Sequence, residues 1–168
     1  MKICGDKWLE LHQDGGYTYV VEVRGFGAAY VLPYAVTQNN GLVVACTREH
    51  LAHQPLGRYY IAGGHCHEDE TPEAAAVREL KEETGIVTSV KDIESLGTVY
   101  QGKAMLSIAH LYAVPMTREM MHQAVESGND APDQTESVRP VLISANDVVR
   151  LSQDAVLLAA VARLMCRS

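Results

Sequence analysis

Three short runs of β-branched and aromatic residues, separated by turn residues, occupy the first third of the chain. They span residues 17–23, 28–36 and 42–47. Gly25 and Gly27 separate the first two runs, and Asn39-Asn40-Gly41 separates the second and third. Tight hairpins require residues that tolerate positive φ, as these do. The pattern therefore predicts antiparallel sheet in this part of the chain.

A strongly helical stretch follows these strands. Thr71 suits the N-cap, Pro72 the first helical position and Gly85 the C-terminal stop, so a helix is predicted over 72–84. A short apolar run over 59–62 ends in Gly63-Gly64. Further strands are expected over 93–100, 106–114 and 140–144, helices over 146–151 and 155–165, and a polar loop over 124–137. The sum predicts an α/β (α+β) fold, a mixed sheet covered by helices, in one domain over 1–168.

Composition limits the class of protein. The chain has 168 residues, of which 47% are hydrophobic and 21% charged, so it can bury a sizeable core. The net charge of -7 argues against a nucleic-acid partner, which usually needs a basic face. No apolar run approaches the roughly 20 residues of a membrane helix, and residues 1–8 lack a signal-peptide stretch. We therefore expect no membrane partner, a cytoplasmic location and four reduced cysteines, since none has CxxC spacing.

The predicted helix and the loop before it are unusually acidic. Between residues 68 and 83 the chain carries seven carboxylates and two cations, Arg78 and Lys81, for a net charge of -5. At about 100° per residue, Glu79, Glu82 and Glu83 lie on one face of the helix, whereas its apolar residues lie on another.

Such a cluster of carboxylates needs a compensating cation. Two unit charges 4 Å apart repel by about 4 kcal/mol at an effective dielectric constant near 20. Arg78 can reach Glu82 at i,i+4, but one guanidinium cannot neutralise three acids. A hard divalent cation can, and Mg²⁺ is the first candidate because it binds through a few carboxylates, waters and substrate phosphate oxygens. The alternative is a solvated helix face without a ligand.

The spacing of the acids supports a divalent cation site, because residues 64–86 resemble the Nudix box. The matching positions are Gly64, Glu70, Arg78-Glu79-Leu80, Glu82-Glu83 and Gly85-Ile86. This resemblance implies an α/β/α sandwich with a loop-helix-loop site. It also implies an enzyme that hydrolyses a nucleoside diphosphate linked to another moiety, with Mg²⁺ or Mn²⁺ bound by the helix.

The resemblance also implies a role for each matching residue. Glu82 and Glu83 correspond to the principal metal ligands, and Glu79 to a further ligand or to the group that orients or deprotonates water. Arg78 corresponds to the residue that fixes the glutamates by ion pairing. The carbonyl of Gly63 is expected to be an additional ligand, since glycine lets the backbone approach a metal closely.

The flanks of the box are similar to those of ADP-ribose pyrophosphatases. Residues 7–11 and 17–22 resemble the amino-terminal strands of that group, and residues 96–100 resemble its segment after the box. The resemblance implies an antiparallel extension over 1–24 that helps to form a homodimer. Gln101-Gly102 stands where the group usually carries a proline, so other nucleoside diphosphate sugars, dinucleoside polyphosphates and nucleoside triphosphates stay open as substrates. A nucleotide-binding sensor without turnover is the alternative of another class.

Other candidate residues lie outside the helix. In the Nudix family an acid from a loop after the box often acts as ligand or base, and Glu136 is the best-placed match. Its competitors are Glu126, Asp130 and Asp133. The cations Arg48, Arg58 and Lys103 are candidates for binding substrate phosphates, and Trp8 for stacking on a base. Solvent exposure or packing is the alternative for each.

Overall fold

The computed structural model describes residues 1–7, 9–23, 27–39, 41–51, 54–127 and 137–167. Within these ranges the chain forms ten strands and four helices. The strands are β1 (Lys2–Gly5), β2 (Leu9–Asp14), β3 (Tyr17–Glu22), β4 (Ala28–Val36), β5 (Leu42–Leu51), β6 (Gln54–Tyr60), β7 (Ala62–His65), β8 (Glu94–Gly102), β9 (Met105–Pro115) and β10 (Ser137–Ser144). The helices are α1 (Pro72–Thr84), α2 (Arg118–Ser127), α3 (Ala145–Leu151) and α4 (Ala155–Met165).

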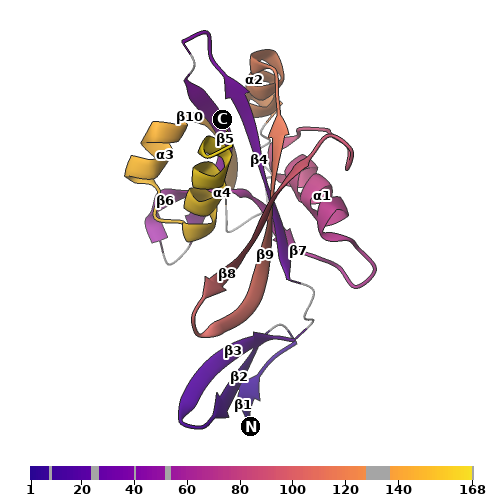
Figure 1. Ribbon diagram of the computed structural model, residues 1–168, viewed down its shortest axis with the longest axis vertical. Helices are drawn as coiled ribbons and strands as arrows, with labels where there is room; N and C mark the ends of the chain where they lie inside the picture. The colour runs from indigo at the N-terminus through magenta and orange to yellow at the C-terminus, as the bar shows by residue number, and fades with distance from the viewer. Residues whose placement is uncertain (8, 24–26, 40, 52–53, 128–136, 168) are drawn as a thin grey trace.

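The strands form one mixed sheet with the order β1-β2-β3-β9-β4-β5-β10, while β6, β7 and β8 pair with β5, β4 and β9. Most pairs are antiparallel, but β9 runs parallel to both β3 and β4. Strands β1–β3 form an antiparallel extension at the end of the molecule away from the helices (Figure 1). This confirms the expected amino-terminal extension.

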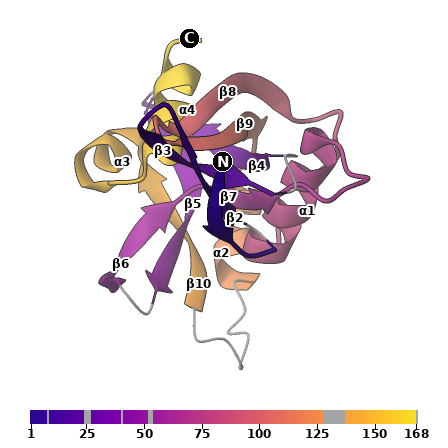
Figure 2. The same cartoon turned by 90° about the horizontal axis from the view of Figure 1, so that it is seen from below.

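Helices cover both faces of the central sheet, with α1 and α3 on opposite sides (Figure 2). Two clusters of buried residues result. One packs α3 and α4 against the sheet around Leu32, Leu111 and Leu157. The other packs α1 and α2 against the opposite face around Val31 and Leu80. The expected α/β/α sandwich is thus confirmed.

The prediction of a hairpin between residues 17–23 and 28–36 is wrong. These residues form β3 and β4, which do not pair with each other. Both pair with β9, whose first residues lie beside Val20 and Val21 and whose later residues lie along β4. A strand of 11 residues is long enough to bridge two neighbours in this way. By contrast, the expected hairpin between β4 and β5 is confirmed, with Val36 opposite Leu42.

The predicted loop over 124–137 is also partly wrong, because α2 extends through Ser127 and β10 begins at Ser137. No element was predicted over 118–123, where the structure has most of this helix, and Met121, which is 1% exposed, packs it against the core. The predicted bounds of β4, α1 and α4 agree with the structure. No helix in the described part of the chain is long and apolar enough to span a bilayer.

Candidate active site

The candidate site lies where β7 leads into α1. We call Gly63–Gly64, in β7, the glycine pair. Gly63 has φ of 155°, and a Cβ there would lie 2.3 Å from the carbonyl oxygen of Ala29 on the neighbouring strand. A Cβ on Gly64 would lie 2.6 Å from Oε1 of Glu79. The absence of side chains at the glycine pair therefore lets the backbone pack against β4 on one side and against a carboxylate of α1 on the other.

Helix α1 is fixed at both ends by the predicted caps. The Oγ1 of Thr71 accepts a hydrogen bond from the backbone N–H of Ala74 at 3.3 Å, and Pro72 opens the helix. Gly85 ends it with φ of 72° and donates its N–H to the carbonyl of Lys81. Leu80 is fully buried and turns the apolar face toward the sheet. The rotation of the helix is thereby set, and it brings Glu79 and Glu83 to the glycine pair.

Arg78 connects four groups of the site. Its Nε and Nη2 donate to the two carboxylate oxygens of Glu70, each at 2.9 Å. Its Nη1 donates to Glu79 at 2.6 Å and to Glu82 at 3.2 Å. Nη2 also donates to the carbonyl of His65 at 3.1 Å. The expected pairing of Arg78 with Glu82 is confirmed, and the bidentate bond to Glu70 holds the loop before the helix as well.

These contacts change the acidity of the groups involved. The hydrogen bonds from Arg78 hold the pKa of Glu70 below its ordinary value of 4.5. The same bonds, first those to Glu70 and then those to Glu79, raise the pKa of Arg78. Both groups therefore stay charged at neutral pH, and the ion pair persists.

Glu83 faces the glycine pair from the last turn of α1. Its Oε2 accepts a hydrogen bond from the N–H of Gly63 at 3.1 Å. Together with Glu79 beside Gly64, this brings two carboxylates to the same short stretch of backbone. Glu82 differs, since its side chain is 58% exposed while that of Glu79 is 15% exposed. Two of the three carboxylates predicted as metal ligands thus lie at the glycine pair, whereas Glu82 is largely exposed and contacts Arg78.

The donor chemistry of this site suits a hard divalent cation. Carboxylate oxygens and a backbone carbonyl are the ligands that Mg²⁺ and Mn²⁺ prefer. Within the described residues, however, no three side chains of His, Cys, Asp or Glu converge closely enough to hold a metal ion as they stand. Arg78 bonds to Glu79 and Glu82 in this arrangement. Metal binding would therefore require these carboxylates to turn from Arg78 toward the ion.

The remaining predicted residues are not gathered at α1. Arg48 and Arg58 are exposed on the hairpin of β5 and β6, which lies on the opposite side of the molecule from α1 in both views (Figures 1 and 2). Lys103 lies between β8 and β9 and is exposed. Trp8 and Glu136 lie outside the described residues. So do Asp130 and Asp133, while the side chain of Glu126 is likewise not described.

A cavity of about 360 Å³ adjoins the glycine pair and contains residues that the sequence did not single out for function. Its lining includes Tyr30, Gly63, Gln101 and Asp154. The Nε2 of Gln101 donates to the hydroxyl of Tyr30 at 3.0 Å. Burial raises the pKa of Tyr30 to about 12 and also raises that of Asp154. Neither Tyr30 nor Asp154 was among the predicted site residues, and the structure shows Asp154 as the N-cap of α4.

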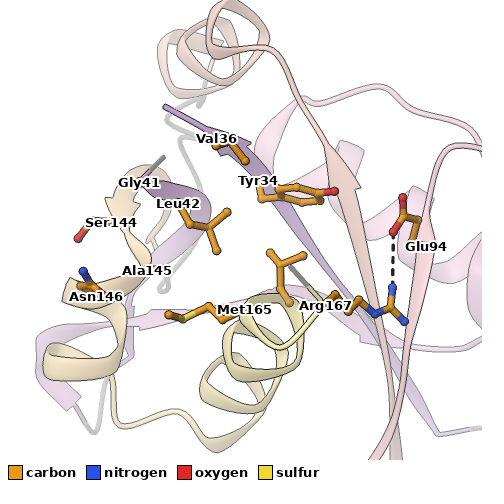
Figure 3. Close-up of a pocket in the computed structure, with 11 residues that line it drawn as sticks. Tyr34, Val36, Gly41, Leu42, Glu94, Ser144, Ala145, Asn146, Met165 and Arg167 are labelled. Atoms are coloured by element: carbon orange, nitrogen blue, oxygen red, sulfur yellow. Dashed lines mark hydrogen bonds and ion pairs between the residues drawn. The ribbon is translucent and has the colours of Figure 1, made fainter. Parts of the chain in front are cut away.

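A larger cavity of about 700 Å³ lies elsewhere, between α4, the start of α3 and the β4–β5 hairpin (Figure 3). Tyr34, Leu42 and Met165 give it an apolar lining. Glu94 and Arg167 at its edge pair with each other, with Nη1 and Oε2 3.5 Å apart. None of the α1 carboxylates lines this cavity, so it lacks the chemistry of the site at the glycine pair.

Comparison with known proteins identifies the family. A family model for the NUDIX domain matches residues 28–162. No curated protein matches the chain. Among solved structures, the chain is similar to NrtR from Shewanella oneidensis complexed with a 27mer DNA, with a TM-score of 0.64 and 20% identity over 84% of this chain and 61% of that one.

Two further structures support the fold. A mutT/nudix family protein from Listeria innocua has a TM-score of 0.60 and 19% identity over 84% of this chain and 94% of that one. The NUDIX domain of Shewanella oneidensis NrtR complexed with ADP ribose has a TM-score of 0.60 and 20% identity over 83% of this chain and 86% of that one. The chain belongs to the NUDIX domain family, and α1 with its carboxylates lies within the matched residues.

Proposed function

We propose that the protein hydrolyses the pyrophosphate bond of a nucleoside diphosphate linked to another moiety, with ADP-ribose as the first candidate substrate and Mg²⁺ or Mn²⁺ as cofactor. The observation that carries the proposal is the arrangement of Glu79 and Glu83 against the glycine pair. The ADP ribose complex of the NrtR NUDIX domain supports the substrate class. Because the chain spans 61% of the NrtR chain in the DNA complex, the activity of the whole protein is part of the proposal.

The proposed metal ligands are the carboxylates of Glu82 and Glu83 and the carbonyl of Gly63, and Glu79 is either a further ligand or the group that deprotonates water. A bound divalent cation would screen the charge of the phosphates and acidify the attacking water. Glu82 suits the outer position because it is largely exposed. Arg78 would stay bonded to Glu70 and to the carbonyl of His65, so it would keep the loop in place after the other acids turned toward the ion.

Hydrolysis then requires a base beside the attacking water. We assign this role to Glu79, which is mostly shielded from solvent and lies against Gly64. Glu79 would take a proton from water as the water oxygen bonds to phosphorus and the anhydride P–O bond breaks. With ADP-ribose the products are AMP and ribose phosphate. Glu136 remains the alternative base in this proposal.

The cavity beside the glycine pair offers a place for the part of the substrate that is not phosphate. It is lined by polar groups from three separate segments, the phenol of Tyr30, the amide of Gln101 and the carboxylate of Asp154. Its volume of about 360 Å³ is within the range of ligand sites, which start near 300 Å³. A nucleoside or a sugar bound there would have its pyrophosphate directed toward α1.

The decisive experiment is a product screen. The protein is incubated with Mg²⁺ and a panel of nucleoside diphosphate sugars, dinucleoside polyphosphates and nucleoside triphosphates, and the products are identified. We expect AMP from ADP-ribose and no turnover in excess chelator. Faster cleavage of a triphosphate or a dinucleoside polyphosphate would select that alternative substrate. Full activity in chelator would contradict the metal role.

The alternative of another class is a nucleotide sensor. NrtR was crystallised with DNA, and its NUDIX domain with ADP ribose, so a protein similar to this chain binds both. The net charge of -7 still predicts that this chain does not bind nucleic acid. Tight binding of ADP-ribose without any Mg²⁺-dependent product would favour the sensor. The presence of Glu79, Glu82 and Glu83 together supports an enzyme over a sensor.

We also propose a homodimer formed through strands β1–β3. These strands project from the body of the molecule (Figure 1) and expose Ile3, Leu9 and Tyr17, the last of which is 70% exposed. Burial of such side chains against a second copy would remove apolar surface from water. Light scattering is expected to give twice the mass of 18.4 kDa, and a monomer at the concentrations used for activity would contradict the proposal.

A further inference from the structure

Glu22 is the one charged residue buried in the described part of the chain, with 5% exposure. It ends β3, beside the first half of β9. The Oγ of Ser107, a residue that is 3% exposed, donates to its Oε2 at 2.8 Å. Burying a charged group costs free energy unless other groups bond to it or pair with it. The hydrogen bond from Ser107 provides such a partner for Glu22.

The other oxygen of Glu22 faces the box. Its Oε1 lies 3.8 Å from Nε2 of His65, the residue that follows the glycine pair. His65 is held in β7 opposite Ala28, and the next residue, Cys66, donates its N–H to the carbonyl of Gly27 at 3.1 Å. The amino-terminal strands thus contact the beginning of the loop that leads to α1.

The backbone of His65 continues this connection to the carboxylates. Its carbonyl accepts the hydrogen bond from Nη2 of Arg78, whose Nη1 bonds to Glu79 and Glu82. The charge of Glu22 also acts on the loop itself. The pKa of Cys66 is raised to about 11, first by burial, then by Glu70, then by Glu22. Glu22, His65 and Arg78 therefore form a continuous chain of contacts.

We propose that Glu22 is a positioning residue of this site, which holds His65 and through it the guanidinium of Arg78, so that the α1 carboxylates are set for a divalent cation. The inference rests on the proposed function. It extends the site beyond the segment matched by the family model, which begins at residue 28. It also gives the amino-terminal extension a part in forming the site of its own chain.

The test compares three variants, Glu22→Gln, His65→Gln and the double variant. Gln at position 22 keeps an acceptor for Ser107 but loses the charge that faces His65. Affinity for Mn²⁺ is measured directly by electron paramagnetic resonance without substrate, and the Mg²⁺ concentration for half-maximal hydrolysis is measured in parallel. We expect each single variant to weaken metal affinity about tenfold, the lower end for residues that orient metal ligands. We expect the double variant to be no weaker than the weaker single variant.

Glu10→Gln is the matched control. Glu10 lies in β2 of the same amino-terminal extension and is partly exposed, but it pairs with Lys2 and His12 and not with a residue of the box. We expect its metal affinity to equal that of the wild type. His65→Gln keeps the test informative if Glu22→Gln fails to fold, because the side chain of His65 is 49% exposed.

Three results would overturn the inference. In the first, both single variants bind Mn²⁺ like the control. In the second, Glu22→Gln lowers the melting temperature but leaves metal affinity unchanged, which would make Glu22 structural only. In the third, the effects of the two variants multiply, so that Glu22 does not act through His65. Absence of hydrolysis by the wild-type protein would count against the proposed function instead, since Mn²⁺ binding is read without substrate.

Discussion

Gly63 and Glu83 are joined by a hydrogen bond in which the backbone N–H of Gly63 donates to Oε2 of Glu83 at 3.1 Å. Gly63 belongs to β7 and Glu83 to the last turn of α1, so the bond ties the strand before the loop to the end of the helix after it. Arg78 ties the same loop to the middle of the helix through the carbonyl of His65. The carboxylates are therefore held against the glycine pair at two points along α1.

Replacement of Glu83 by Gln is expected to remove the negative charge of the side chain while keeping its hydrogen bond from Gly63. The amide oxygen can still accept the bond from Gly63, so the melting temperature should change little. Loss of the negative charge should lower kcat by about 10²- to 10³-fold, the scale for removing one electrostatic group from a preorganised site. Steady-state kinetics with ADP-ribose and Mg²⁺ would measure the change. Glu94→Gln, at the distant cavity, is the control expected to retain wild-type kinetics, and equal kinetics in both variants would contradict the role of Glu83.

The two glycines of the pair should respond differently to alanine. At Gly64 the new Cβ would meet the carboxylate of Glu79, the far end of a flexible side chain. Stability should then be nearly unchanged, while displacement of Glu79 lowers kcat by about 10²-fold. At Gly63 the Cβ would meet the backbone carbonyl of Ala29, and φ is unfavourable, so the fold should lose about 1–3 kcal/mol.

Chemical denaturation and kinetics on the two alanine variants would check this contrast. A stable Gly63→Ala protein, or a fully active Gly64→Ala protein, would show that the backbone does not approach its neighbours as closely as described.

Local sequence signals were sufficient for the helix of the site. Thr71, Pro72 and Gly85 predicted its bounds, and the i,i+4 spacing predicted the contact of Arg78 with Glu82. These interactions depend on residues a few positions apart, whose geometry in a helix is known in advance.

Contacts between distant segments could not be predicted in the same way. The pairing of β9 with both β3 and β4 depends on which of several apolar runs become neighbours, and turn residues do not determine that. The approach of Glu22 to His65 follows from this pairing. The cavity of Tyr30 and Asp154 likewise requires the sheet and α4 to be assembled first. A buried carboxylate in a strand has no periodic pattern that would reveal its partner.

The ion pair of Glu70 with Arg78 predicts a dependence of stability on pH. Arg78 lowers the pKa of Glu70 in the folded protein, so the ionised form is favoured by folding. The contribution is present above the ordinary pKa of 4.5 and is lost as pH falls through the lower folded value. The melting temperature of wild type should exceed that of Glu70→Gln at neutral pH, and the difference should shrink in acid. Circular dichroism over this range measures it, and a difference independent of pH would contradict the pairing.

Substitutions of Asp154 test both the proposed role of the cavity and the capping of α4. Its Oδ1 accepts a hydrogen bond from the N–H of Leu157 at 2.6 Å, while burial raises its pKa. Folding thus favours the protonated form, a contribution present below the ordinary pKa of 3.8 and lost as pH rises through the folded value. Asp154→Asn keeps a capping oxygen without the buried charge. Its stability at neutral pH should equal or exceed that of wild type, whereas Asp154→Ala should lose about 1 kcal/mol.

The kinetics of Asp154→Asn distinguish a role of Asp154 in binding substrate in the cavity from its role in capping α4. If the cavity binds the nucleoside or sugar, the KM for the substrate should change while kcat stays close to the wild-type value, because α1 is untouched. Thermal denaturation confirms that the cap is intact, and substrate titration at saturating Mg²⁺ gives KM. Unchanged KM values across the whole substrate panel would remove the cavity from the proposed binding site and leave Asp154 with a structural role in α4.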